Sequence, residues 1–235
     1  MAITKTFSKT IKSLFAATVL ATYAGSASAT AVFNFNATNL GVAASTGYSS
    51  VGMSSGGIGV TVQGLTINND NAGGILSTGA ANVYVSSSNN LGVSSNASDG
   101  TTMDGGSCSS ACSSSGDPDE GLLITFDQVV NLLFVNFDNF SSSGSDDFNL
   151  TVDGTLKLLD FNFADSSPLA SSTGLPGQTD EYSFSGISGT QFLFWADGSS
   201  DSFKIDLMEV PEPTTLGMLV AGVALFGMGR RRNSV

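Results

Sequence analysis

Ten short runs rich in apolar and β-branched residues are spread along the chain between residues 31 and 210, and segments rich in Gly, Ser, Asn and Asp separate them. They cover residues 31–35, 58–67, 82–85, 121–126, 131–137, 147–152, 156–163, 182–184, 191–196 and 202–210. Several alternate with a period of two, as in Phe148, Leu150 and Val152, which fall on one strand face. No helical period occurs between the two ends of the chain, and the separations in the second half are short. The sequence therefore predicts an all-β antiparallel sandwich of jelly-roll type.

Two finer patterns occur within these runs. Residues 119–138 and 180–197 each contain an acidic pair, a strand, a short turn, a Phe-rich strand and an Asp. One hairpin used twice would explain this likeness, and so would chance within repetitive β sequence. In the last run, the alternation predicts that Phe203, Ile205 and Leu207 share one face.

The first 29 residues have the composition of a secretory signal peptide. Three lysines precede an apolar run over residues 14–24, and the small residues Ala27 and Ala29 follow with the spacing that signal peptidase accepts. This order predicts cleavage after Ala29 and export of the remaining chain. The alternative, a first amphipathic helix of the fold, leaves the order of the three regions unexplained.

Removal of both ends leaves a strongly acidic segment. Residues 30–210 keep two basic residues, Lys157 and Lys204, against 19 acidic residues, a formal charge of −17. Such a segment repels nucleic acid and anionic membrane surfaces, and it attracts cations. Solubility outside the cell is an equally simple interpretation of this charge.

The end of the chain combines two prolines, an apolar stretch and three arginines. Residues 214–229 are apolar, Gly or Thr, and as a helix they would extend roughly 24 Å, a short span for a bilayer core of about 30 Å. The arginines that follow would stay on the cytoplasmic side and leave the preceding domain outside. Pro211 and Pro213 keep the junction before this stretch extended. The sequence predicts a single C-terminal transmembrane helix.

The tail resembles the PEP-CTERM protein-sorting signal, which is also catalogued as the ice-binding protein C-terminal domain. The resemblance rests on three parts in order: Pro211-Glu212-Pro213, a short apolar stretch and an arginine cluster. The resemblance implies a Gram-negative bacterial export substrate that the membrane enzyme exosortase recognises and cleaves near the motif. It also implies delivery to the cell surface or the exopolysaccharide matrix. A plain C-terminal membrane anchor is the alternative. Carried over residue by residue, the recognition element is Pro211, Glu212 and Pro213, and the stop is Arg230, Arg231 and Arg232.

These features divide the chain into a signal peptide (1–29), an acidic β-sandwich ectodomain (30–209) and a sorting tail (210–235). The ectodomain also loosely resembles the jelly-roll ectodomains that PEP-CTERM proteins often carry. We expect a structural or adhesive protein of the surface or extracellular matrix, associated with exopolysaccharide or biofilm, or alternatively a calcium-assisted carbohydrate-binding module. The expected partners are signal peptidase, exosortase and exopolysaccharide, and nucleic acid is not expected.

Acidic residues gather in the Gly/Ser-rich segment just before the run at 121–126. Carboxylate oxygens in a flexible, cation-attracting segment suit Ca²⁺, which takes about six to eight oxygen ligands. The spacing is not that of an EF-hand, and an ordinary solvated loop is the alternative. The candidate ligands are Asp99, Asp104, Asp117, Asp119 and Glu120.

The two cysteines, Cys108 and Cys112, lie in the same segment. In an exported protein an even number of cysteines indicates a disulfide, and a ring this small would contribute roughly 2 kcal/mol on the chain-entropy model. Free thiols are the alternative. Two cysteines and no histidine do not make a zinc site.

Catalytic signals are weak, and we expect no enzyme. The chain has no histidine, the most common general base. Residues 52–56 fit Gly-x-Ser-x-Gly, but no histidine is present to activate Ser54. Acids are plentiful, yet no pair stands out for glycoside hydrolysis. Trp195 has two interpretations, an exposed sugar-stacking platform or a core residue on an alternating strand, and the core interpretation is favoured.

Overall fold

The computed structural model describes residues 29–69, 74–87, 90–95, 101–105, 118–140, 146–162, 164–165, 167–172, 181–196, 198 and 201–212. The chain divides into two compact units, one of Ala31–Pro211 and one formed by Met1–Thr30 with Glu212–Val235. Apart from Ala29, the predicted signal helix lies outside the described residues, as does the predicted transmembrane helix at 214–229. Within the described residues, no helix has the length and apolar character needed to span a membrane.

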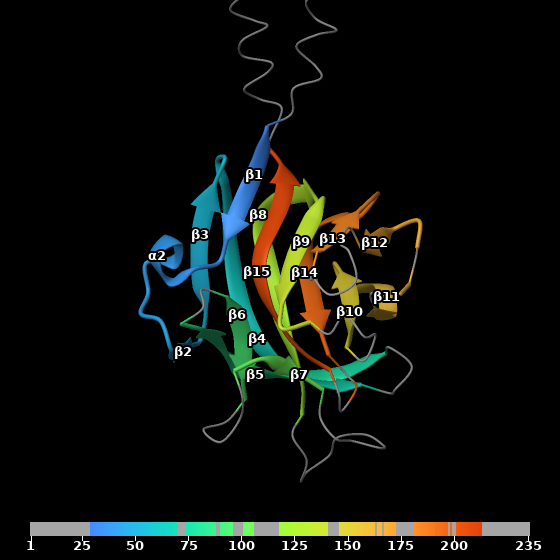
Figure 1. Cartoon of the computed structure of the whole chain (residues 1–235), viewed down its shortest axis with the longest axis horizontal. Coiled ribbons are helices and arrows are strands. Elements are labelled where there is room, and N and C mark those ends of the chain that lie inside the picture. Colours follow the sequence, from blue (N-terminus) through green and yellow to red (C-terminus); the bar gives the residue numbers. More distant parts are fainter. Residues whose placement is uncertain are drawn as a thin grey trace, which may run out of the picture. The chain divides into compact units, whose positions relative to one another are not determined.

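β-Strands dominate the described chain, which contains one short helix besides them (Figure 1). The elements are β1 (Thr30–Asn34), α2 (Ala37–Leu40), β2 (Thr46–Tyr48), β3 (Val51–Ser55), β4 (Ile58–Asn69), β5 (Ile75–Val85), β6 (Leu91–Ser94), β7 (Met103–Asp104), β8 (Asp119–Asn131), β9 (Phe134–Asp138), β10 (Asp147–Val152), β11 (Thr155–Asn162), β12 (Ala170–Ser172), β13 (Glu181–Phe184), β14 (Ser188–Trp195) and β15 (Ser202–Pro211). Each of the ten predicted runs overlaps one of these strands, although the run at 131–137 begins before β9 and the run at 82–85 covers only the end of β5.

The strands form one continuous sheet that folds over on itself. Hydrogen-bonded neighbours follow the order β11-β10-β14-β8-β4-β5-β6-β15-β9-β13-β12, with β1 and β7 beside β15, β2 beside β5 and β3 beside β4. The bend lies in β5, whose first part pairs with β4 and whose last residues pair with β6 and β2. The pairs along this path are antiparallel, so the predicted all-β antiparallel class is confirmed.

Phenylalanine rings fill the space between the two halves of the folded sheet. Figure 1 shows β15 and β9 passing in front of β8 and β14, and the ring contacts confirm that these layers face each other. The Phe137 ring of β9 lies 4.9 Å from Phe148 of β10 and 5.8 Å from Phe194 of β14, centroid to centroid. Phe33 of β1 lies 5.4 Å from Phe126 of β8. Each such pair contributes roughly 0.5–1.5 kcal/mol beyond the area that it buries.

The predicted face of β15 is correct only in its first half. Phe203 and Ile205 are fully buried, but the next buried positions are Met208 and Val210, and Leu207 is only half-buried. A register shift against β9 falls between Ile205 and Leu207. This bulge adds a residue to β15, so the alternation changes phase there.

The two similar segments, residues 119–138 and 180–197, do not form hairpins, so the hairpin interpretation of their likeness was wrong. β8 pairs with β4 and β14, and β9 pairs with β13 and β15, which places the two strands of the first segment in opposite halves of the folded sheet. The second segment, β13 and β14, crosses in the same way. The two copies instead pair with each other, as Gly121 opposite Trp195 and Val135 opposite Tyr182 show.

The Ser/Gly-rich stretch over residues 36–57 belongs to the fold. It begins with α2, where the Asn36 side-chain oxygen accepts a hydrogen bond from the Asn39 N–H at 2.8 Å and caps the helix. Gly41 ends the helix in the left-handed conformation, with φ 67°. The stretch continues into β3, which pairs with β4 from Val51 to Ser55.

Candidate functional site

The sorting motif begins inside the sheet. β15 ends at Pro211, and the backbone N–H of Glu212 donates a hydrogen bond to the carbonyl oxygen of Ala29 at 2.7 Å. Further along the same strand pair, the Phe35 N–H donates to the Asp206 carbonyl at 2.9 Å. The last described residues of the chain are therefore tied to the first.

This arrangement brings together two of the predicted processing sites. Ala29 is the residue after which signal peptidase is expected to cut, and Pro211 and Glu212 are two of the three recognition residues. Both recognition residues are half-buried. The other predicted residues of these two sites, Ala27, Pro213, Arg230, Arg231 and Arg232, lie outside the described residues.

The predicted calcium ligands occupy different kinds of position. Asp119 and Glu120 are not loop residues, because β8 begins two residues earlier than predicted, and both side chains are buried opposite Ile67 and Thr66 of β4. Asp104 lies on β7. Within the described ranges, no three acidic or other metal-ligating side chains are placed to hold a metal ion. The remaining residues predicted for this segment, Asp99, Asp117, Cys108 and Cys112, lie outside those ranges.

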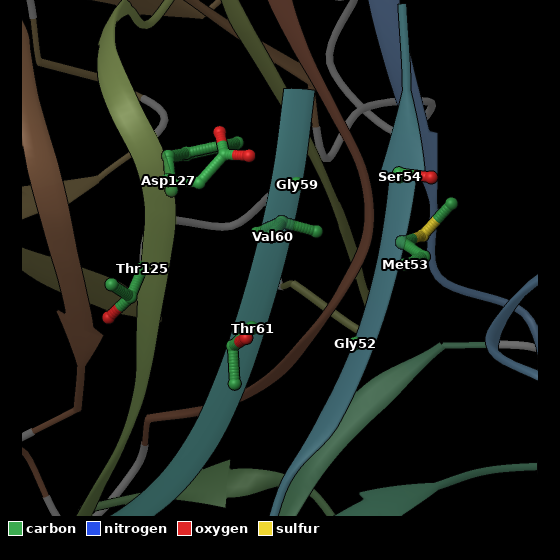
Figure 2. A pocket seen from close by; sticks show the side chains of 9 residues that line it. Gly52, Met53, Ser54, Gly59, Val60, Thr61, Thr125 and Asp127 are labelled. Carbon is green, nitrogen blue, oxygen red and sulfur yellow. The ribbon is translucent and has the colours of Figure 1, made fainter. Parts of the chain in front are cut away.

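A shallow groove of about 480 Å³ crosses the strands β3, β4 and β8 (Figure 2). Two glycines keep it open. A Cβ atom on Gly59 would lie 2.9 Å from the Asp127 carboxylate, and one on Gly52 would lie 3.0 Å from the Val60 carbonyl oxygen. The lining residues are Gly52, Met53, Ser54, Gly59, Val60, Thr61, Thr125, Phe126 and Asp127.

The groove presents hydroxyl groups and one carboxylate to solvent. Ser54, Thr61 and Asp127 are exposed and come from three different strands, as Figure 2 shows. Such groups donate and accept hydrogen bonds, which is the chemistry that a polyhydroxylated ligand requires. Sequence reasoning missed this groove because its strands meet only through pairing between β3, β4 and β8.

The Gly-x-Ser-x-Gly pattern also lies at this groove. Its serine, Ser54, sits on the extended strand β3, and Gly56 follows in the turn to β4 with φ 57°. A nucleophilic serine of this motif sits on a sharp strand-to-helix turn, which is not the geometry of β3.

Trp195 is a core residue, as the favoured interpretation predicted. Its side chain has no exposed surface and packs with Ile67 and Leu193 in a second hydrophobic cluster. Leu65, Ile75 and Leu123 border this cluster. Its partners come from β4, β5, β8 and β14, on the sheet face opposite the phenylalanine core.

The carboxyl groups of Asp206 and Asp153 have shifted pKa values. Burial, and to a lesser extent the charge of Asp138, raises the pKa of Asp206 above its ordinary value of 3.8. The pKa of Asp153 lies below that value, mainly because the carboxylate accepts a hydrogen bond from the Gln191 N–H at 2.9 Å. The Thr190 N–H and hydroxyl add further hydrogen bonds to it.

In a comparison with known protein families, one family model matches the C-terminal part of the chain. The family model of the PEP-CTERM protein-sorting motif matches residues 209–233. No curated protein and no solved structure matched the chain. The motif implies export, a membrane-anchored sorting intermediate and processing by exosortase, a membrane enzyme. The chain therefore carries a PEP-CTERM protein-sorting motif, which includes the end of β15 and Glu212.

Proposed function

We propose that the protein is a non-enzymatic component of the bacterial surface or extracellular matrix, released there after its sorting tail is processed. The match of the sorting motif to residues 209–233 carries this proposal. The folded unit ends at Pro211, so a cut on the C-terminal side of Pro211-Glu212-Pro213 leaves the unit intact. The mature segment then carries the strongly acidic charge, which suits association with exopolysaccharide through bridging cations and disfavours nucleic acid.

The proposal is tested by where the protein accumulates. Wild type and a Pro211→Ala/Pro213→Ala variant are expressed in a host with exosortase and in the same host without it, and the cell fractions are compared. We expect wild type at the surface or in the medium only when exosortase is present, and the variant in the membrane in both hosts. Accumulation of the variant at the surface at the wild-type level contradicts the proposal.

The groove favours carbohydrate binding as a second candidate function. Its hydroxyl groups and the Asp127 carboxylate match a polysaccharide better than an apolar ligand, and its volume of about 480 Å³ lies within the range of about 300–1,000 Å³ that is typical of small-ligand sites. A jelly-roll sandwich would be a familiar setting for such a site, and the two facing layers support that type. Calcium assistance is a further part of this candidate, and it rests on the acidic residues in the segment before β8 and at the start of that strand.

Retention on a column of the host's polysaccharide separates the two functions. Asp127→Asn combined with Thr61→Val removes a charge and a hydroxyl group from the groove, and Val129→Ala on the same strand is the matched control because its side chain is 71% exposed. Binding that sugar competes away and that the double variant loses supports the second candidate. If EDTA also abolishes it, calcium takes part. Wild type that passes through unretained removes this candidate.

A further inference from the structure

The Pro-Glu-Pro tripeptide has only one backbone hydrogen-bond donor. Proline has no N–H, so Pro211 and Pro213 donate nothing, and the Glu212 N–H is the single donor of the recognition element. The structure shows this N–H bonded to the carbonyl oxygen of Ala29 at 2.7 Å. A partner that reads the tripeptide as an extended strand must hydrogen-bond to its backbone, and this donor is already in use.

Ala29 is also the residue after which signal peptidase is predicted to cut, so it would leave with the signal peptide. Hydrolysis of the Ala29–Thr30 bond consumes one water molecule, turns the Ala29 carbonyl into the carboxylate of the departing leader and makes Thr30 the new amino terminus. The acceptor of the Glu212 N–H then no longer belongs to the chain. The rest of the strand pair keeps its own bond, from the Phe35 N–H to the Asp206 carbonyl at 2.9 Å.

We infer that removal of the leader frees the Glu212 N–H, so that the tail-processing enzyme can bind the sorting motif. Signal-peptidase hydrolysis then produces the substrate of that enzyme. Before that cut, the Ala29 carbonyl accepts the hydrogen bond of the Glu212 N–H. After it, Glu212 is the first residue beyond the folded unit with a free donor. This inference rests on the proposed function, and it fixes the order of the two processing reactions.

Amide hydrogen exchange tests the inference without any processing enzyme. Three chains in detergent are compared: the full precursor, a chain of residues 29–235 and a chain of residues 30–235. We expect the Glu212 amide to exchange slowly in the first two and about fivefold faster or more in the third, the protection that one typical hydrogen bond provides. The Phe35 amide is the internal control and stays protected in all three.

Two exchange results overturn the inference. One is equal Glu212 exchange in all three chains, because the Ala29 carbonyl then protects nothing. The other is faster exchange of both Glu212 and Phe35 in the shortest chain, because the whole strand β1 then loosens and Ala29 has no specific role.

A second arm follows the order of processing in cells. An Ala27→Leu/Ala29→Leu variant blocks leader removal but keeps the backbone carbonyl at position 29, and Ala21→Leu within the apolar run is the matched control. We expect the blocked variant to keep its tail and the control to lose both ends. A chain that retains its leader and lacks its tail overturns the inference. Retention of the tail by wild type contradicts the proposed function instead, and the exchange experiment still decides the inference.

Discussion

The backbone N–H of Glu212 donates to the carbonyl oxygen of Ala29 at 2.7 Å, so the described part of the chain begins and ends at one hydrogen bond. The predicted signal-peptidase site and the sorting motif, which lie at opposite ends of the sequence, are neighbours in the structure. The strand pair β1 and β15 produces this proximity, because the two strands pair beside each other in the folded sheet.

Phe137 is central to the core, and its truncation should cost much of the stability. Its ring contacts Phe148, Phe194 and Phe203 from three other strands. We expect Phe137→Ala to lower the free energy of unfolding by about 3–5 kcal/mol, measured by urea denaturation. Val129→Ala, at a position that is 71% exposed, should change it by less than about 0.5 kcal/mol. A Phe137→Ala effect as small as that of Val129→Ala contradicts the described core.

Trp195 should tolerate loss of its indole N–H better than loss of its ring. The side chain is fully buried, and among the described residues its Nε1 has no hydrogen-bond partner. Trp195→Phe removes a buried donor that gains nothing, whereas Trp195→Ala opens a cavity that costs about 3–5 kcal/mol. We therefore expect the Phe variant to be clearly more stable than the Ala variant in urea denaturation. Equal losses would show that the N–H itself stabilises the fold.

Asp206 should destabilise the fold as pH rises. Because its pKa is raised in the folded state, its contribution to stability is fully present below 3.8 and is lost as pH rises through the folded pKa. We expect Asp206→Asn to be more stable than wild type at about pH 7 and to lose this advantage below the ordinary pKa. Unfolding curves of both proteins across this range measure the difference. A constant difference at every pH contradicts the assignment.

Asp153 should act in the opposite direction. Its pKa is lowered, so its stabilising contribution is present above 3.8 and is lost as pH falls through the folded pKa. Asp153→Asn suits the test because Asn tolerates the backbone φ of 48° at this turn. We expect this variant to be less stable than wild type near neutral pH and to approach it in acid. Greater stability of the variant at neutral pH would contradict the hydrogen-bond geometry.

The sequence was a good guide to local structure and a poor guide to long-range pairing. All ten runs became strands, because alternation and turn residues are local signals. The bulge before Leu207 and the crossing of β8 and β9 between the two halves depend on which strands lie beside them, and no local pattern encodes that. The strands β2, β3, β6, β7 and β12 were missed because they are short and most of them are rich in Gly or Ser, which conceals any alternation.

The same distinction between local patterns and long-range pairing applies to the candidate sites. The sorting motif is a contiguous pattern, so the sequence was enough to find it. The contact between Ala29 and Glu212 joins distant segments, and so does the groove that Ser54, Thr61 and Asp127 line. Those features became visible only once the sheet was known.

The intact mass of the protein recovered from the surface or medium of its host tests the central claim most directly. It is measured beside a variant with Pro211, Glu212 and Pro213 changed to Ala, and Val129→Ala serves as the processing control. We predict that wild type and the control lack the leader and the tail, while the variant keeps its tail and stays in the inner membrane. If wild type and variant both retain residues up to Val235, the tail is a plain anchor, and the account of sorting is wrong.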